Sequence, residues 1–132
     1  MTYWKDSFLV GVPKIDDQHK KLIAAIDELM AACTKGQGRD KIDKTLNFVI
    51  AYTKEHFADE ERLQAERNYP GMIAHKRLHT QFLSTVKALE AEYEQTGPTV
   101  TLVGKLNKSL IDWLIHHIAN EDSKVGEHIK NR

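Results

Sequence analysis

The sequence of 132 residues has one cysteine, three prolines and seven glycines. A single cysteine, Cys33, cannot form an intramolecular disulfide, which excludes a disulfide-stabilised scaffold. Its helical spacing from Leu29 and Met30 predicts a small, buried apolar residue. One hydrophobic core must therefore hold the chain together, and an apolar content of 41% is sufficient for this.

An excess of charge of either sign is also missing, because nineteen Lys and Arg residues balance nineteen Asp and Glu residues. This balance argues against nucleic acid and anionic membranes as partners, since both attract basic protein faces. No apolar run approaches the roughly 20 residues that cross a bilayer, and the first residues lack the apolar stretch of a signal peptide. We therefore expect a cytoplasmic protein that binds neither nucleic acid nor membranes.

Helix-breaking residues are confined to three short segments, at 36–38, 68–71 and 96–98. They predict a single domain, 1–132, with an extended arm at 1–15 and helices at about 16–36, 40–67, 70–95 and 99–127. Inward positions within these stretches step by three and four residues, as in Ile42, Leu46 and Val49. Short loops favour antiparallel neighbours. The predicted fold is all-α, an up-down-up-down antiparallel four-helix bundle.

Histidine is the residue type in excess, since the seven histidines outnumber Phe, Tyr, Met or Pro taken singly. Five of them, with Glu60, fall on inward positions where the pattern calls for leucine. Burying a polar group without a partner costs roughly 1–3 kcal/mol, so these groups need a common partner. The bundle topology brings them, with Asp122, to one level near one end. The seven predicted metal-binding residues are His19, His56, Glu60, His75, His79, His117 and Asp122.

The spacing within each pair suits metal binding. His56 and Glu60 are four residues apart, as are His75 and His79, which places each pair on one helix face. His117 and Asp122 are five apart, and an ideal helix would turn them roughly 140° away from one another. We therefore predict a π-type distortion between these two residues, with Asp122 turned inward.

The donor set exceeds what one four-coordinate zinc ion needs. Five imidazoles, two bridging carboxylates and a shared oxide or hydroxide fill eleven of the twelve positions around two six-coordinate ions, which leaves one open for a ligand such as O2. Nitrogen and carboxylate donors suit iron, manganese or zinc, so spacing alone does not identify the metal.

Together these motifs resemble the hemerythrin family over nearly the whole chain. They are an arm with Trp4 and 8–11, followed by Ile15-Asp16-Asp17-Gln18-His19, His56-Phe57-Ala58-Asp59-Glu60, His75-Lys76-Arg77-Leu78-His79, and a last helix from Trp113 through His117 to Asp122. The arm and compact length resemble the single-domain bacterial members more than the fused sensor domains.

The resemblance implies reversible O2 binding at a non-haem di-iron centre, in a protein that is not an enzyme. One iron is held by His75, His79 and His117, and the other by His19 and His56. Glu60, Asp122 and an oxo or hydroxo group bridge them, and O2 binds the iron of the two-histidine set. Residues expected to line the O2 pocket, or to serve equally as ordinary core, are Phe57, Trp113, Leu114 and Ile118. We expect a monomer that passes O2 to an oxygen-using enzyme.

Other polar residues are given ordinary roles. We expect His116 to face outward, and His128 to be solvated beyond the last bundle turn. The acidic neighbours of Glu60, which are Asp59 and Glu61, and the pair at 20–21 are interpreted as solvated faces. Alternative functions are an oxygen sensor, an enzyme acting on O2, peroxide or nitric oxide, and a metal store. A ferritin-like site is disfavoured, because no histidine here has a Glu three residues before it.

Overall fold

The computed structural model describes residues 4–36 and 39–130, and throughout these residues it contains helices and no strand. The predicted all-α class is confirmed. Among the described residues, none of the helices combines the length and the apolar character that crossing a bilayer requires. Apart from a short 3₁₀ turn, η1 (Asp6–Phe8), the residues that the structure describes form four helical rods.

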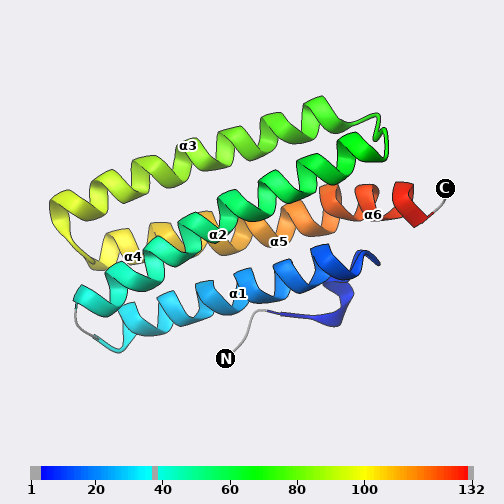
Figure 1. Cartoon of the computed structure of the whole chain (residues 1–132). Coiled ribbons are helices and arrows are strands. Elements are labelled where there is room, and N and C mark those ends of the chain that lie inside the picture. The colour runs from blue at the N-terminus through cyan, green and yellow to red at the C-terminus, as the bar shows by residue number, and fades with distance from the viewer. Residues whose placement is uncertain (1–3, 37–38, 131–132) are drawn as a thin grey trace.

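The first three rods are α1 (Pro13–Thr34), α2 (Arg39–Glu66) and α3 (Met72–Thr96). The fourth, which we call the C-terminal rod, is a helix over residues 100–130 with two π-helical segments. It comprises α4 (Val100–Leu106), η2 (Asn107–Asp112), α5 (Trp113–His117), η3 (Ile118–Asp122) and α6 (Ser123–Lys130). Figure 1 shows the rods packed side by side, with the starts of α1 and α3 at the same end as the finishes of α2 and α6.

The core runs along the inside of the rods and is mainly aliphatic. Leu22, Ile26 and Leu29 of α1 are almost completely buried, as are Leu102 and Leu106 of α4. Burying an aliphatic side chain of this size contributes roughly 1.5–3 kcal/mol, so the three- and four-residue spacing that produces the core also holds the rods together. This apolar packing fills the end of the bundle that lies away from the histidines.

The chain before α1 is fixed by a buried carboxylate. Asp16 accepts hydrogen bonds from the backbone N–H groups of Val10, at 2.7 Å, and Gly11, at 3.1 Å. On the other side, the Val10 carbonyl approaches Gly126 of α6 so closely that a Cβ atom there would lie 2.2 Å from it. The helix starts at Pro13, inside the arm expected at 1–15, because proline suits the first helical position. Residues 1–3 of the expected arm lie outside the described residues.

Three side chains outside the centre also test the sequence interpretation. His116 is exposed, as predicted. Cys33 is half-buried against the core instead of fully buried, and this burial raises the pKa of its thiol. The prediction for His128 is wrong, because α6 continues to Lys130 and the half-buried imidazole lies with its Nε2 2.9 Å from the carbonyl of Arg67.

Candidate metal centre

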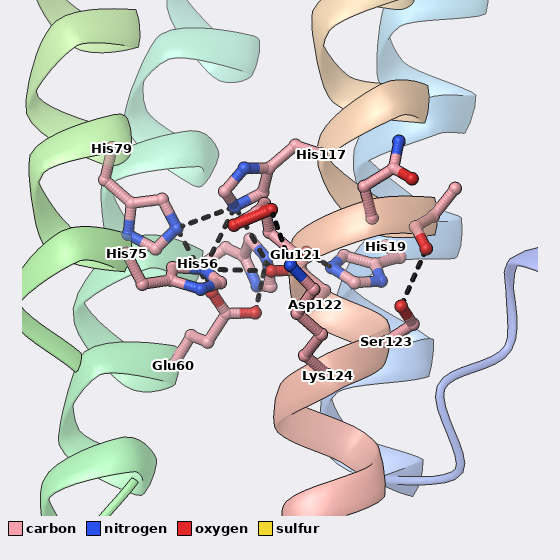
Figure 2. Close-up of polar contacts among 12 residues, drawn as sticks. His19, His56, Glu60, His75, His79, His117, Glu121, Asp122, Ser123 and Lys124 are labelled. Carbon is pink, nitrogen blue, oxygen red and sulfur yellow. Dashed lines mark hydrogen bonds and ion pairs between the residues drawn. The ribbon is translucent and has the colours of Figure 1, made fainter. Parts of the chain in front are cut away.

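The structure brings all seven predicted residues together in the interior, at the level where α1 and α3 begin (Figure 2). Every rod contributes: α1 carries one of them, and α2, α3 and the C-terminal rod carry two each. No side chain in the set is more than 3% exposed. The set is His19, His56, Glu60, His75, His79, His117 and Asp122.

The seven residues form two overlapping groups. In each group, one nitrogen or oxygen atom from every member lies within 4.8 Å of the others. The larger group contains three histidines, His75, His79 and His117, and the smaller one contains His19 and His56. Glu60 and Asp122 belong to both groups. We call them the three-histidine group and the two-histidine group.

Glu60 divides its two oxygens between the groups. Its Oε1 lies 2.7 Å from Nε2 of His75 and 3.1 Å from Nε2 of His79, both in the three-histidine group. Its Oε2 lies 3.9 Å from Nε2 of His56 in the two-histidine group. The carboxylate therefore spans the two groups, one oxygen on each side.

Asp122 repeats this division from the opposite rod. Its Oδ1 lies 3.0 Å from Nε2 of His75 and 3.2 Å from Nε2 of His117, while its Oδ2 lies 3.0 Å from Nε2 of His19. Each of the two carboxylates therefore presents one oxygen to each histidine group.

A π-helical segment places Asp122 in the centre. The segment η3 begins directly after His117 and ends at Asp122, whose side chain is 1% exposed. Its wider turn absorbs the fifth residue between the two, which a regular α-helix would have directed away from the centre. The predicted distortion and the inward orientation of Asp122 are both confirmed.

Buried polar atoms without hydrogen bonds support a cation at this position. Within the described part of the chain, no oxygen of Glu60 or Asp122 and no ring nitrogen of His19 has a hydrogen bond of acceptable geometry. Nε2 of His117 also faces the Nε2 atoms of His75 and His79, at 3.0 and 3.2 Å. Ring nitrogens that converge on one another and carboxylate oxygens without a hydrogen bond are the arrangement that a metal ion completes, and nitrogen with carboxylate oxygen suits iron.

The pKa values of His56 and Asp122 fit a role as metal ligands, whereas His75 carries a proton. Burial lowers the pKa of His56 to about 4, so its imidazole is neutral, as a metal ligand must be. Burial alone would raise the pKa of Asp122, but its contacts with His117, His19 and His75 outweigh burial and hold that pKa well below its usual value. Burial lowers the pKa of His75, but Asp122 and Glu60 outweigh it and raise that pKa to about 9. A metal must therefore displace a proton from His75.

Comparison with known proteins agrees with this geometry. The family model of the hemerythrin HHE cation binding domain matches residues 10–129, which is most of the chain and includes all seven residues. The chain belongs to the hemerythrin family. A bacteriohemerythrin from Stenotrophomonas maltophilia is 33% identical over 127 residues, which are 96% of this chain and 80% of that protein.

Other hemerythrin relatives span bacteria and animals. A bacteriohemerythrin from Pseudomonas aeruginosa is 32% identical over 120 residues, which are 91% of this chain and 76% of that protein. A myohemerythrin from Riftia pachyptila is 31% identical over 121 residues, which are 92% of this chain and 88% of that protein. The family match over residues 10–129 includes the centre and nearly all of the four rods.

Sequence reasoning did not predict the roles of Glu61 and Gln18, which contact two histidines of this centre. Nδ1 of His79 lies 2.8 Å from a carboxylate oxygen of Glu61, and Nδ1 of His56 lies 2.8 Å from the amide oxygen of Gln18. Gln18 in turn donates to Asp59 at 2.8 Å. The interpretation of Asp59 and Glu61 as ordinary solvated faces is therefore wrong. In the sequence, Asp59 and Glu61 are visible only as neighbours of a predicted ligand on α2. That position does not reveal a contact with a residue of another rod.

Two of the four expected pocket residues contact histidines of the centre. Phe57 stacks on His79 with ring centroids 3.8 Å apart, and the half-buried Trp113 stacks on His117 at 4.4 Å. Both rings thus contact the three-histidine group, although Phe57 also lies 5.9 Å from His56. The remaining two, Leu114 and Ile118, are buried at no more than 2% exposure.

Proposed function

We propose that this chain binds O2 reversibly at a non-haem di-iron centre, and that it does so as one domain, 1–132, with the up-down-up-down bundle topology. The observation that carries the proposal is the pair of buried groups that share Glu60 and Asp122 but differ by one histidine. Equal groups would saturate two ions alike. Unequal groups leave one ion short of a protein ligand, and that ion has room for a small molecule.

We assign the ligand sets from the two groups. His75, His79 and His117 would hold one iron, and His19 and His56 would hold the other, with the two shared carboxylates as bridges. When bound, the iron pair supplies the electrons and the open position that O2 binding requires. The chain supplies five imidazole rings and two carboxylates as ligands, all of them nearly inaccessible to bulk water.

Burial is the protein's means of keeping the binding reversible. Reversible binding requires that the walls of the site keep water and proton donors away from the open position. Leu114 and Ile118 are apolar and almost inaccessible. His56 has a pKa of about 4, so its imidazole is neutral at physiological pH. We propose that Phe57, Trp113, Leu114 and Ile118 provide the apolar wall, and that a monomeric carrier delivers O2 to an oxygen-using enzyme.

Metal analysis combined with absorption spectroscopy tests this function. The reduced protein should contain two irons per chain and should develop an absorption band in air that disappears when O2 is removed. Irreversible oxidation with turnover of a substrate would identify an enzyme instead. Zinc without any oxygen-dependent band would identify a metal store.

A pair of histidine variants controls for indirect effects. His79→Ala removes a proposed ligand and should lose bound iron together with the band. His116→Ala removes an exposed imidazole next to the ligand His117 and should keep both. If the His79→Ala protein retains two irons and an unchanged spectrum, the ligand assignment is wrong.

A further inference from the structure

The outer ring nitrogens of two proposed ligands have acceptors of opposite character. Nδ1 of His79 lies 2.8 Å from a carboxylate oxygen of Glu61, and Nδ1 of His56 lies 2.8 Å from the amide oxygen of Gln18. The first imidazole belongs to the three-histidine group and the second to the two-histidine group. The distances are equal, so the difference between the contacts is one of charge.

Both acceptors select the same ring tautomer. The carboxylate of Glu61 accepts hydrogen bonds, so Nδ1 of His79 donates and Nε2 keeps its lone pair for a metal. In Gln18, the amide nitrogen donates to Asp59 at 2.8 Å, which directs the amide oxygen toward His56. Nδ1 of His56 therefore also donates, and its Nε2 also faces inward.

Salt bridges at the surface hold this second contact in place. Asp59 accepts from Arg62 at 2.9 Å and lies 3.7 Å from Nζ of Lys14. The hydrogen bond from Gln18, together with these cations, lowers the pKa of Asp59. The amide of Gln18 thus lies between a charged surface cluster and His56. It fixes the orientation of the His56 ring and places no negative charge beside it.

The charge difference has a known effect on metal ligands. A carboxylate on the outer nitrogen makes an imidazole a stronger donor and favours the higher oxidation state of the ion it binds, whereas a neutral amide fixes the ring with a smaller effect. The remaining imidazole of the two-histidine group, His19, has no hydrogen bond at its Nδ1 within the described residues.

We propose that Glu61 and Gln18 are positioning residues that make the two halves of the centre unequal. Glu61 strengthens His79 and stabilises the oxidised form of the ion in the three-histidine group. Gln18 fixes the orientation of His56 without a negative charge. The ion in the two-histidine group is therefore held less strongly, and its open coordination position stays available for a ligand. This inference rests on the proposed function, because it assigns the metal pair to these two groups.

The decisive substitutions move charge and leave shape nearly unchanged. Glu61→Gln keeps an acceptor for His79 and removes the charge. Since Glu61 also forms part of the wall of a surface cavity of about 440 Å³, this change disturbs little packing. The double substitution Gln18→Glu with Asp59→Asn moves the carboxylate from the surface position to the one beside His56, and the total charge stays constant. Glu55→Gln, on an exposed residue next to His56 in sequence, is the matched control.

Two measurements report the effect. Zn²⁺ affinity, measured by competition with a chelator dye, does not depend on iron or O2. It should fall 10- to 100-fold in Glu61→Gln and rise in the double variant. In an anaerobic titration of iron-loaded protein with ferricyanide, each ferrous ion gives one electron to one ferricyanide. The equilibrium should shift toward the reduced centre in Glu61→Gln and toward the oxidised centre in the double variant.

Opposite shifts in the two variants, with no shift in Glu55→Gln, would support the inference, because a merely structural role would weaken binding in both. Shifts of the same sign, or a shift in Glu55→Gln equal to that in Glu61→Gln, would overturn it. If the unsubstituted protein binds O2 reversibly and the variants do not differ from it, this inference fails and the proposed function stands. If the unsubstituted protein does not bind two metal ions, both fail.

Discussion

The stability of the metal-free protein should depend on pH in a way that identifies His75 as part of a cation site. Burial lowers the pKa of His75, but the contacts with Asp122 and Glu60 outweigh it and raise the pKa from 6.5 to about 9. The folded chain therefore binds a proton more strongly at His75 than the unfolded chain does between these two values. This contribution to stability is complete below pH 6.5 and is lost as the pH rises through 9.

The size of the effect follows from the shift. One pKa unit corresponds to about 1.4 kcal/mol, so the free energy of unfolding should fall by about 3 kcal/mol between pH 6.5 and pH 9. His56 acts in the opposite direction at lower pH, because burial lowers its pKa to about 4 and protonation then favours the unfolded chain. The metal-free protein should be most stable near pH 6.5.

Urea unfolding followed by circular dichroism, in the presence of a chelator, measures this directly. His75→Gln should abolish the loss of stability on the alkaline side and thus serves as the control. With Zn²⁺ saturating the site the loss of stability over this range should disappear, because metal-bound His75 carries no proton in the folded chain. Metal-free stability that is flat or rises between pH 6.5 and 9 would refute the account of His75.

Four other substitutions test separate parts of the structure. In thermal denaturation, Gly126→Ala should lower the free energy of unfolding by roughly 1–3 kcal/mol, because the new Cβ would meet the Val10 carbonyl. Gly104→Ala, where a Cβ meets nothing within 4 Å, should raise the free energy of unfolding in the same experiment. His19→Ala should reduce the metal content from two ions to one, because only the two-histidine group loses a ligand; loss of both ions would contradict that grouping. Asp16→Ala should lower the free energy of unfolding by roughly 1–3 kcal/mol, because it leaves two N–H groups of the arm without their acceptor. Limited proteolysis should then cut the arm faster. An unchanged cleavage rate would show that other contacts hold the arm.

Much of the centre was predictable because its residues interrupt an apolar pattern. A histidine such as His56 or His79 on an inward position is visible in the sequence, since burial is expected there and imidazole is costly to bury alone. The five-residue spacing from His117 to Asp122 was informative for the same reason, because a regular helix cannot place both inward. The structure contains the π segment that this argument required.

The outer hydrogen bonds were not predictable in this way. Glu60 and Glu61 are adjacent and chemically alike, and helical periodicity places only Glu60 on the inward face. The carboxylate of Glu61 reaches His79 because α2 and α3 pack at a distance that side-chain volumes across the whole interface decide. The contact between Gln18 and His56 joins α1 to α2 and depends on packing for the same reason.

The amino-acid sequence by itself determined the helical class, the inward set of histidines and carboxylates, and the need for a distortion before Asp122. These depend on periodicity and burial, which are local properties of a chain. Only the tertiary structure decided how each carboxylate divides its oxygens between the two groups, and which imidazole has a charged acceptor and which a neutral one. Such distinctions depend on distances of a few tenths of an ångström between rods, and these are set by the packing of the entire core.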